Sequence, residues 1–235
     1  MADAPPSRCL RLLVTGTDTG VGKTYVGCLL ARRLAAEGIT VFPLKPVESG
    51  CRPGPGGSLF PADAAALRDA VAPSLPLTAV CLYPLSAPLS PHLAARREGA
   101  SIDIGRIRGA IEEAARRSDV VLVEGAGGIS VEIVEGYSFA DLARESSLAV
   151  LVVAGNRLGV LNHVRLTIRY LESEGLSLFG VVLSDLPADP SPARETNEDE
   201  VRRLAGGRYL GRIPQGAAVL PGEVFSRFLE FGLTQ

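Results

Sequence analysis

The sequence is poor in several residue types that often mark a functional class. Among its 235 residues it has no tryptophan, one methionine, two histidines and four cysteines. The cysteines stand at positions 9, 28, 51 and 81 without C-x-x-C spacing, so they imply neither a zinc site nor a disulfide framework. We expect Cys9 and Cys28 to pack as small apolar residues, and a reducing cytoplasm is the simplest location.

The two histidines offer little support for one common enzyme class. No serine or cysteine stands in a nucleophile-elbow motif, so a catalytic triad is not indicated. We therefore expect neither His92 nor His163 to act as a catalytic base. His163 is expected on a helix surface or at an interface.

Charge of one sign and long apolar runs are also missing. The formal net charge of −2 gives no basic face for nucleic acid and no acidic tail. No apolar run reaches the roughly 18 residues of a membrane helix, and residues 1–8, which we expect to be flexible, lack the order of a signal peptide. These features predict a cytoplasmic protein without a nucleic-acid or membrane partner. A length of 235 residues allows one domain with a sizeable core, over residues 1–235, and is tight for two.

The most informative segment that is present follows the apolar run 10–14. It reads Gly16-Thr17-Asp18-Thr19-Gly20-Val21-Gly22-Lys23-Thr24 and precedes a helical pattern of apolar residues. Strand, glycine-rich loop, Lys-Thr and helix are typical of a phosphate-binding loop, although Thr17 holds the place of the usual first glycine. Backbone N–H groups can bind phosphate, Lys23 can reach the β- and γ-oxygens, and the Thr24 hydroxyl can ligate Mg²⁺. The segment predicts a nucleoside triphosphate site.

Short β-rich runs alternate with helical patterns along the chain. The strand-like runs are 10–15, 39–44, 120–124, 148–154, 178–184 and 209–213, and the helix candidates are 23–37, 103–117, 138–145, 161–174 and 195–204. Several runs are almost entirely Val, Leu and Ile, as in strands covered on both faces. The alternation predicts an α/β fold of the P-loop NTPase type, a parallel sheet with helices on both faces. The Gly- and Pro-rich segment 50–62 predicts a mobile loop, either a lid or a disordered insertion.

A carboxylate ends the strand-like run 120–124. Glu124 is followed by Gly125-Ala126-Gly127-Gly128, where the glycines let a ligand or a backbone come close. In proteins with a phosphate-binding loop, a carboxylate at such a strand end completes the Mg²⁺ shell. Because Mg²⁺ prefers hard oxygen ligands and keeps several waters, one or two carboxylates suffice.

Several motifs occur in the order found in one enzyme family. They are Thr15-Gly16-Thr17-Asp18-Thr19, Val21-Gly22-Lys23-Thr24, Leu44-Lys45-Pro46-Val47, Ser49-Gly50, Ser90-Pro91-His92, Val123-Glu124-Gly125-Ala126-Gly127-Gly128, Leu158-Gly159 with Asn162-His163, and Gly211 with Ile213-Pro214. This ordered set, which extends from Val14 to about Gly216, resembles dethiobiotin synthetase. The blocks around Lys45 and Glu124 make the resemblance specific, because they are not general features of phosphate-binding loops.

The resemblance implies an ATP- and Mg²⁺-dependent ligase of biotin biosynthesis that closes a cyclic urea. In that family one amine of 7,8-diaminopelargonic acid takes up CO₂ as a carbamate, whose oxygen accepts the γ-phosphoryl group to give a carbamic-phosphoric anhydride. The second amine attacks the carbonyl and expels phosphate, which leaves dethiobiotin and ADP. The family binds the substrate carboxylate at a helix start of the partner subunit, so the resemblance also implies a homodimer.

The site residues follow from the same resemblance. Lys23 and Lys45 would be catalytic, because phosphoryl transfer needs cations on the developing charge. Thr24, Asp63 and Glu124 would hold Mg²⁺. The nucleotide would contact Thr19, Gly20, Val21, Gly22, Lys23, Thr24, Tyr25, Asp63, Glu124, Gly125, Ala126, Gly127, Ser184, Asp185, Pro214, Gln215 and Gly216. The substrate would contact Ser49, Ser90, Pro91, Gly159, Val160, Leu161 and Asn162.

Two of these residues can also be interpreted without the family. Asp63 precedes Ala64-Ala65-Ala66-Leu67 and is then a helix N-cap, a role compatible with metal contact. Lys45 follows the second strand-like run, 39–44, and is expected beside the phosphate loop; the alternative is an exposed lysine at a strand end.

Three positions depart from the family pattern. Gly20 stands where some members carry glutamate, and Thr196 stands near the place of a tyrosine that can help hold the substrate carboxylate. Ser184-Asp185 replaces a frequent Asn-Asp, in which the asparagine reads the adenine edge. A hydroxyl offers less than a donor–acceptor amide, so base selectivity is expected to be weak.

Of three alternative functions, two stay open, the first and the third. A ParA/MinD-type regulatory ATPase shares the fold, but it carries a signature lysine where this chain has Asp18, and no basic amphipathic tail is seen. A cobyrinate-type amidoligase needs an appended glutaminase domain, for which 235 residues leave no room. The third is a paralogue of dethiobiotin synthetase with a shifted substrate.

Overall fold

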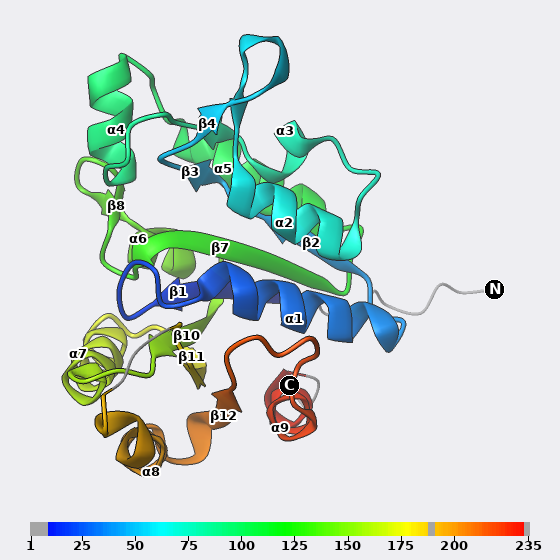
Figure 1. Cartoon of the computed structure of the whole chain (residues 1–235). Coiled ribbons are helices and arrows are strands. Elements are labelled where there is room, and N and C mark those ends of the chain that lie inside the picture. Colours follow the sequence, from blue (N-terminus) through cyan, green and yellow to red (C-terminus); the bar gives the residue numbers. More distant parts are fainter. Residues whose placement is uncertain (1–8, 188–190, 233–235) are drawn as a thin grey trace.

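A six-stranded parallel sheet forms the centre of the molecule (Figure 1). The computed structural model describes residues 9–187 and 191–232, so the flexibility predicted for residues 1–8 lies outside the described residues. The strands follow the order β12-β11-β10-β1-β7-β2, and each neighbouring pair is parallel. Their bounds are β1 (Leu10–Gly16), β2 (Val41–Leu44), β7 (Val120–Gly128), β10 (Ala149–Gly155), β11 (Leu178–Ser184) and β12 (Tyr209–Ile213).

Alternate residues of the strands enter two separate hydrophobic layers. Along β1, Leu12 and Val14 belong to one layer, whereas Leu13 belongs to the other. Successive side chains of a strand point to opposite faces, so an unbroken apolar run supplies both layers at once. The continuous Val/Leu/Ile runs of the sequence are thus explained by burial on two sides.

Helices cover both faces of the sheet, as the sequence predicts. The layer that contains Leu12 is closed by α1 (Lys23–Ala36), α2 (Ala62–Val71) and α9 (Gly222–Gly232). The opposite layer is closed by α4 (Pro91–Glu98), α5 (Ile104–Ala115), α6 (Phe139–Glu145), α7 (Val160–Ser173) and α8 (Ala193–Ala205). In Figure 1, α1 runs along β1 and β7, while α7 and α8 lie together at the other end of the sheet.

Smaller elements connect these layers. They are β3 (Val47–Glu48) paired with β6 (Tyr83–Pro84), β4 (Arg52–Pro53) paired with β5 (Leu59–Phe60), β8 (Glu132–Val134) paired with β9 (Tyr137–Ser138), the short helix α3 (Leu77–Val80), and the 3₁₀ turns η1 (Pro55–Gly57) and η2 (Gly206–Arg208). The single α/β domain and its parallel sheet are therefore as predicted. The sequence analysis did not predict α3, α4 or α9.

The segment predicted as a mobile loop contains a short hairpin. Arg52 pairs with Phe60 between β4 and β5, and the connection projects from the body of the molecule in Figure 1. Its mobility and a role as a lid stay predictions. Within residues 9–187 and 191–232, no helix is both long enough and apolar enough to cross a bilayer.

Candidate active site

The phosphate loop lies between the carboxyl end of β1 and the first turn of α1. Gly22 is the N-cap of α1 and has a φ of 93°, a left-handed conformation that favours glycine. A Cβ atom at Gly22 would lie 2.8 Å from the Ser184 hydroxyl, so a larger residue there would require that hydroxyl to move. The loop therefore keeps its backbone against the end of β11.

Lys23 and Lys45 are the only two lysines of the chain, and both line one cavity. The cavity measures about 500 Å³, and its other lining residues are Thr19, Gly20, Gly22, Thr24, Tyr25, Glu48, Ser49, Asp63, Glu124, Ala126 and Gly127. Burial and the nearby Lys45 cation lower the pKa of Lys23. Both lysine side chains of the chain thus face one cavity, which three carboxylates also line.

Lys45 is a buried cation between two carboxylates. Its Nζ atom donates to Glu124 Oε1 at 2.5 Å and to Asp63 Oδ2 at 3.3 Å. Burial opposes the charged form, but the Glu124 and Asp63 carboxylates dominate and raise the pKa of Lys45. The strand order places β7 between β1 and β2, so Lys45 emerges next to Glu124, in the cavity that the phosphate loop also lines, and it is not an exposed strand-end lysine.

The oxygen atoms around Glu124 suit a hard divalent cation. The Thr24 hydroxyl donates to Glu124 Oε1 at 2.9 Å, which brings two of the predicted metal ligands together. Glu124 is fully buried, and its Oε2 atom has no hydrogen-bond partner among the described residues. An unpaired buried carboxylate oxygen is costly, and a bound cation would satisfy it. Asp63, the third predicted ligand, has a side chain that is 46% exposed and lines the same cavity.

The structure corrects the prediction of Asp63 as a helix N-cap. The N-cap of α2 is Pro61, which makes no side-chain capping bond, and Asp63 lies in the first turn. The carboxylate of Glu48 takes the capping role, accepting from the backbone N–H groups of Asp63 at 3.0 Å and Ala64 at 2.9 Å. The sequence analysis missed Glu48, because its partners lie across the hairpin and no local motif marks the contact.

A second cavity of about 370 Å³ adjoins the first. Thr19, Ser49, Ala126 and Gly127 line both, and Ser90 and Pro91 line only the second, together with Pro88, Leu89 and Val131. The predicted substrate residues Ser49, Ser90 and Pro91 therefore share one space. His92 is turned toward the β8 segment, where its Nε2 atom lies 3.5 Å from Glu132 Oε2.

The residues predicted to meet the base lie beyond the phosphate loop, at the ends of β11 and β12. The Tyr25 hydroxyl donates to the carbonyl of Pro214 at 3.1 Å or that of Ala217 at 2.8 Å, which holds the segment 214–217 against α1. Ser184 is buried against Gly22. The predicted base-contacting residues Ser184 and Pro214 thus lie at the same edge of the sheet.

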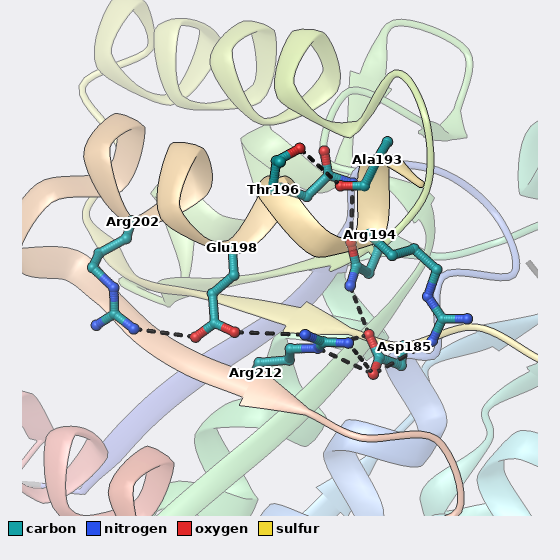
Figure 2. A network of polar contacts seen from close by, with 9 residues as sticks. Asp185, Ala193, Arg194, Thr196, Glu198, Arg202 and Arg212 are labelled. Atoms are coloured by element: carbon teal, nitrogen blue, oxygen red, sulfur yellow. Dashed lines mark hydrogen bonds and ion pairs between the residues drawn. The ribbon is translucent and has the colours of Figure 1, made fainter. Parts of the chain in front are cut away.

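Asp185 is held by a network of polar contacts (Figure 2). Arg212 donates to its two carboxylate oxygens at 2.9 to 3.1 Å, and Asn156 donates to Oδ1 at 2.7 Å. Burial opposes ionisation, but the bonds from Arg212 and Asn156 lower the pKa of Asp185. Arg194 lies 3.4 Å away at the start of α8. With its oxygens occupied, Asp185 ties β11 to β12 and α8 and is poorly placed to read a base by its side chain.

Thr196, which stands near the place of the family's tyrosine, lies outside both cavities. It is exposed on α8, and its hydroxyl donates to the carbonyl of Ala193 at 3.3 Å, as Figure 2 shows. The side chain of Thr196 therefore lines neither cavity.

The predicted carboxylate-binding residues 159–162 form the start of α7. Gly159 is the N-cap, with a φ of 94°, and the first turn of a helix leaves backbone N–H groups free for an anion. None of residues 159–162 lines either cavity of its own chain. Leu158 and Leu166 nearby are large apolar side chains that are 78% and 60% exposed. The α7 start is therefore separate from the cavity that its own chain encloses.

Comparisons with known proteins point to one family. The chain matches the family described as AAA domain over residues 10–221. It is 42% identical over 202 residues to the ATP-dependent dethiobiotin synthetase BioD of Anaeromyxobacter sp. (strain Fw109-5), covering 86% of this chain and 88% of that protein. The protein of the same name from Aromatoleum aromaticum is 38% identical, covering 90% of this chain and 93% of that one.

This chain belongs to the dethiobiotin synthetase family.

The dethiobiotin synthetase relatives are named as ATP-dependent, and the chain is accordingly an ATP-dependent ligase that forms carbon–nitrogen bonds. A solved ParA family ATPase from Chlorobium tepidum TLS is 16% identical with a TM-score of 0.53, covering 96% of this chain and 94% of that one. At that identity the likeness shows the shared fold alone.

Proposed function

We propose that the enzyme converts 7,8-diaminopelargonic acid, CO₂ and ATP to dethiobiotin, ADP and phosphate. The observation that carries the proposal is the position of Lys45, in a cavity shared with the phosphate loop and open toward Ser49. One cavity can accept the triphosphate and the adjoining one a small acyclic substrate. The two meet at Thr19, Ser49, Ala126 and Gly127, where the reacting groups would come together.

The proposed reaction has three steps. One amine of the substrate loses a proton and adds to CO₂, which gives a carbamate. A carbamate oxygen attacks the γ-phosphorus of ATP, the bond from that phosphorus to the bridging oxygen breaks, and ADP leaves. The second amine then attacks the carbonyl carbon, the bond from that carbon to the phosphate-bearing oxygen breaks, and phosphate leaves as the five-membered urea closes.

The two lysines would have different tasks in these steps. Lys23, at the start of α1, would bind the β- and γ-phosphates together with the loop backbone. Lys45 approaches from the side of Glu124 and Ser49 and would stabilise the carbamate and the charge that develops on the transferred group. Phosphoryl transfer relies on such electrostatic stabilisation more than on covalent help from the protein.

Thr24, Asp63 and Glu124 would hold Mg²⁺ against the triphosphate. The buried, unpaired Oε2 atom of Glu124 and the half-exposed Asp63 carboxylate support this assignment. The cation supplies charge neutralisation of the phosphates when it is bound.

The reaction is tested by incubation of the protein with 7,8-diaminopelargonate, bicarbonate and MgATP, followed by mass spectrometry. We expect a product in which one carbonyl replaces two N–H hydrogens, with ADP formed in equal amount. ATP hydrolysis that does not respond to the diamine, without that product, would contradict the proposal. Turnover with a related diamine and none with this one would instead indicate a paralogue with a shifted substrate.

We further propose that the active enzyme is a homodimer in which the α7 start of one subunit binds the substrate carboxylate held by the other. The separation of residues 159–162 from both cavities of their own chain and the exposed Leu158 and Leu166 support this. Leu166→Glu is expected to produce monomers with little activity, because it places a charge in an apolar contact. Sedimentation under assay conditions checks this. A fully active monomer would rule out the shared site.

Weak discrimination between nucleotide bases is expected as well. Most binding energy should come from the triphosphate, which is the same for every base, and Ser184 offers only one hydroxyl. GTP and CTP should support ring closure within about tenfold of ATP, or about 1.4 kcal/mol. Comparing kcat/KM for the three nucleotides in the wild type and in Ser184→Ala checks this. A thousandfold preference for ATP would contradict the expectation that Ser184 weakens base selectivity.

A further inference from the structure

A carboxylate outside the predicted site links three parts of the cavity. Glu48 ends the short strand β3 and is 6% exposed. Its two oxygens accept from the backbone N–H groups of Asp63 and Ala64, at 3.0 and 2.9 Å. These are donors of the first helical turn, which have no partner inside the helix. The N-cap Pro61 provides no side-chain acceptor, so Glu48 replaces the missing cap from across the hairpin.

The contact between Glu48 and the start of α2 completes a closed set of contacts that includes Lys45. Lys45 and Glu48 lie three residues apart on one segment, whose backbone is anchored by bonds to Val80 at 2.8 Å and from Leu85 at 2.8 Å. Glu48 holds the backbone of Asp63, and the Asp63 carboxylate lies 3.3 Å from Lys45 Nζ. A single short segment thus supplies the cation and also fixes the position of the carboxylate that faces it.

By holding the start of α2, Glu48 affects the orientation of Asp63, whose side chain is less buried than those of Lys45 and Glu124. The Asp63 side chain is 46% exposed, whereas those of Lys45 and Glu124 are 4% and 0% exposed. The strands of the preceding hairpin are short, and Arg52, Pro53 and Phe60 in them are exposed. Each Glu48 oxygen accepts from one backbone N–H group of α2, which holds the carboxylate against the start of that helix.

We propose that Glu48 is a positioning residue, which directs the Asp63 carboxylate toward Lys45 and the divalent cation by capping α2. The part that concerns the cation rests on the proposed function. Without Glu48 the first turn of α2 loses its cap, the Asp63 carboxylate spreads over more orientations, and cation binding weakens while the phosphate loop is unchanged.

The experiment compares the wild type with Glu48→Ala, Glu48→Gln and a matched control, Asp103→Ala. Asp103 caps α5 by accepting from the N–H of Arg106 at 3.2 Å and lies outside both cavities. The affinity for a fluorescent ADP is measured with and without Mg²⁺. Since the chain has only two lysines, ¹³C labelling of the lysine ε-carbons gives two lysine signals, and Lys45 can be followed without any substrate.

Glu48→Ala is expected to raise the Mg²⁺ concentration needed for half-maximal tightening of ADP binding about tenfold, which corresponds to about 1.4 kcal/mol. Glu48→Gln, which retains one acceptor oxygen, is expected to raise this Mg²⁺ concentration about threefold. If the alanine variant does not fold, the glutamine variant provides the test. ADP affinity without Mg²⁺ should change less than about twofold. The Lys45 signal should shift while that of Lys23 does not, and hydrogen exchange should become faster at the amides of Asp63 and Ala64.

Two results would overturn the inference. One is a Glu48→Ala protein that behaves like Asp103→Ala, with a lower melting temperature but an unchanged Mg²⁺ requirement and Lys45 signal. The other is hydrogen exchange at Asp63 and Ala64 that is as slow in both Glu48 variants as in the wild type. If ADP binding by the wild type ignores Mg²⁺, the proposed metal site fails, and the Lys45 signal and the exchange rates still judge the capping role of Glu48.

Discussion

Replacement of Lys45 by alanine is expected to lower kcat by about 10²-fold or more while the affinity for ATP changes little. Lys45 would stabilise charge that develops only during transfer, and loss of one such preorganised contact costs rate rather than ground-state binding. Its Nζ atom contacts Glu124, Asp63 and the carbonyl of Gly125, all at one end of the sheet. Steady-state kinetics together with direct measurement of ATP binding separate the two effects.

Lys23→Ala is the matched control, because it removes the other lysine of the same cavity. It should weaken nucleotide binding and lower kcat together, since Lys23 would contact the phosphates in both the ground state and the transition state. A Lys45→Ala enzyme with turnover close to that of the wild type would refute the role assigned to Lys45. A Lys45→Ala enzyme whose only change is weaker ATP binding would also refute that role.

Removal of Glu124 is expected to cause the second large effect, on stability as well as activity. Glu124→Ala leaves the Lys45 cation, 4% exposed, with the Asp63 carboxylate and the carbonyl of Gly125 as its remaining contacts, each at 3.3 Å. Breaking a buried ion pair from one side costs about 3 kcal/mol or more, because the remaining charge is desolvated without compensation. The variant should also lose Mg²⁺-dependent activity by about 10²-fold, since it would lack a metal ligand and the Thr24 contact at 2.9 Å.

A double-mutant cycle with Lys45→Met tests the reason for this loss. Glu124→Ala combined with Lys45→Met leaves neither buried charge, so the double variant should be more stable than Glu124→Ala alone. The free energy of unfolding can be followed by circular dichroism in urea, because the chain has no tryptophan for fluorescence. Additive losses in the double variant would mean that the two side chains do not act as a pair.

The main elements of the fold could be predicted because their signals are local. A strand buried on both faces needs an unbroken apolar run, and the runs that begin near residues 10, 120 and 149 have this pattern. The short elements α3 and α4 were missed, because a few residues give too little periodicity to distinguish a helix from a loop. Helix α9 was missed for another reason. Its Phe225 and Phe228 pack into the hydrophobic layer beside β11 and β12, and this long-range packing is not visible in the local sequence.

The predicted site also has one part that local sequence signals reveal and another that depends on contacts between distant segments. The phosphate loop and Lys45 follow β1 and β2, Glu124 lies within β7, and the carboxyl ends of parallel strands meet at one edge of a sheet. The roles of Asp185 and Glu48 could not be predicted, since their partners come from distant segments. Arg212 and Asn156 occupy the Asp185 carboxylate, and Glu48 caps a helix that begins beyond a hairpin.

By itself, the sequence determined the α/β class, the phosphate loop and the type of residue at each strand end, because these depend on periodicity and on short motifs. The tertiary structure decided which strand ends are neighbours. It placed β7 between β1 and β2, so that Glu124 lies between the phosphate loop and Lys45 and pairs with that lysine. Strand order depends on how crossovers pack across the whole sheet, and no local stretch of sequence carries that information.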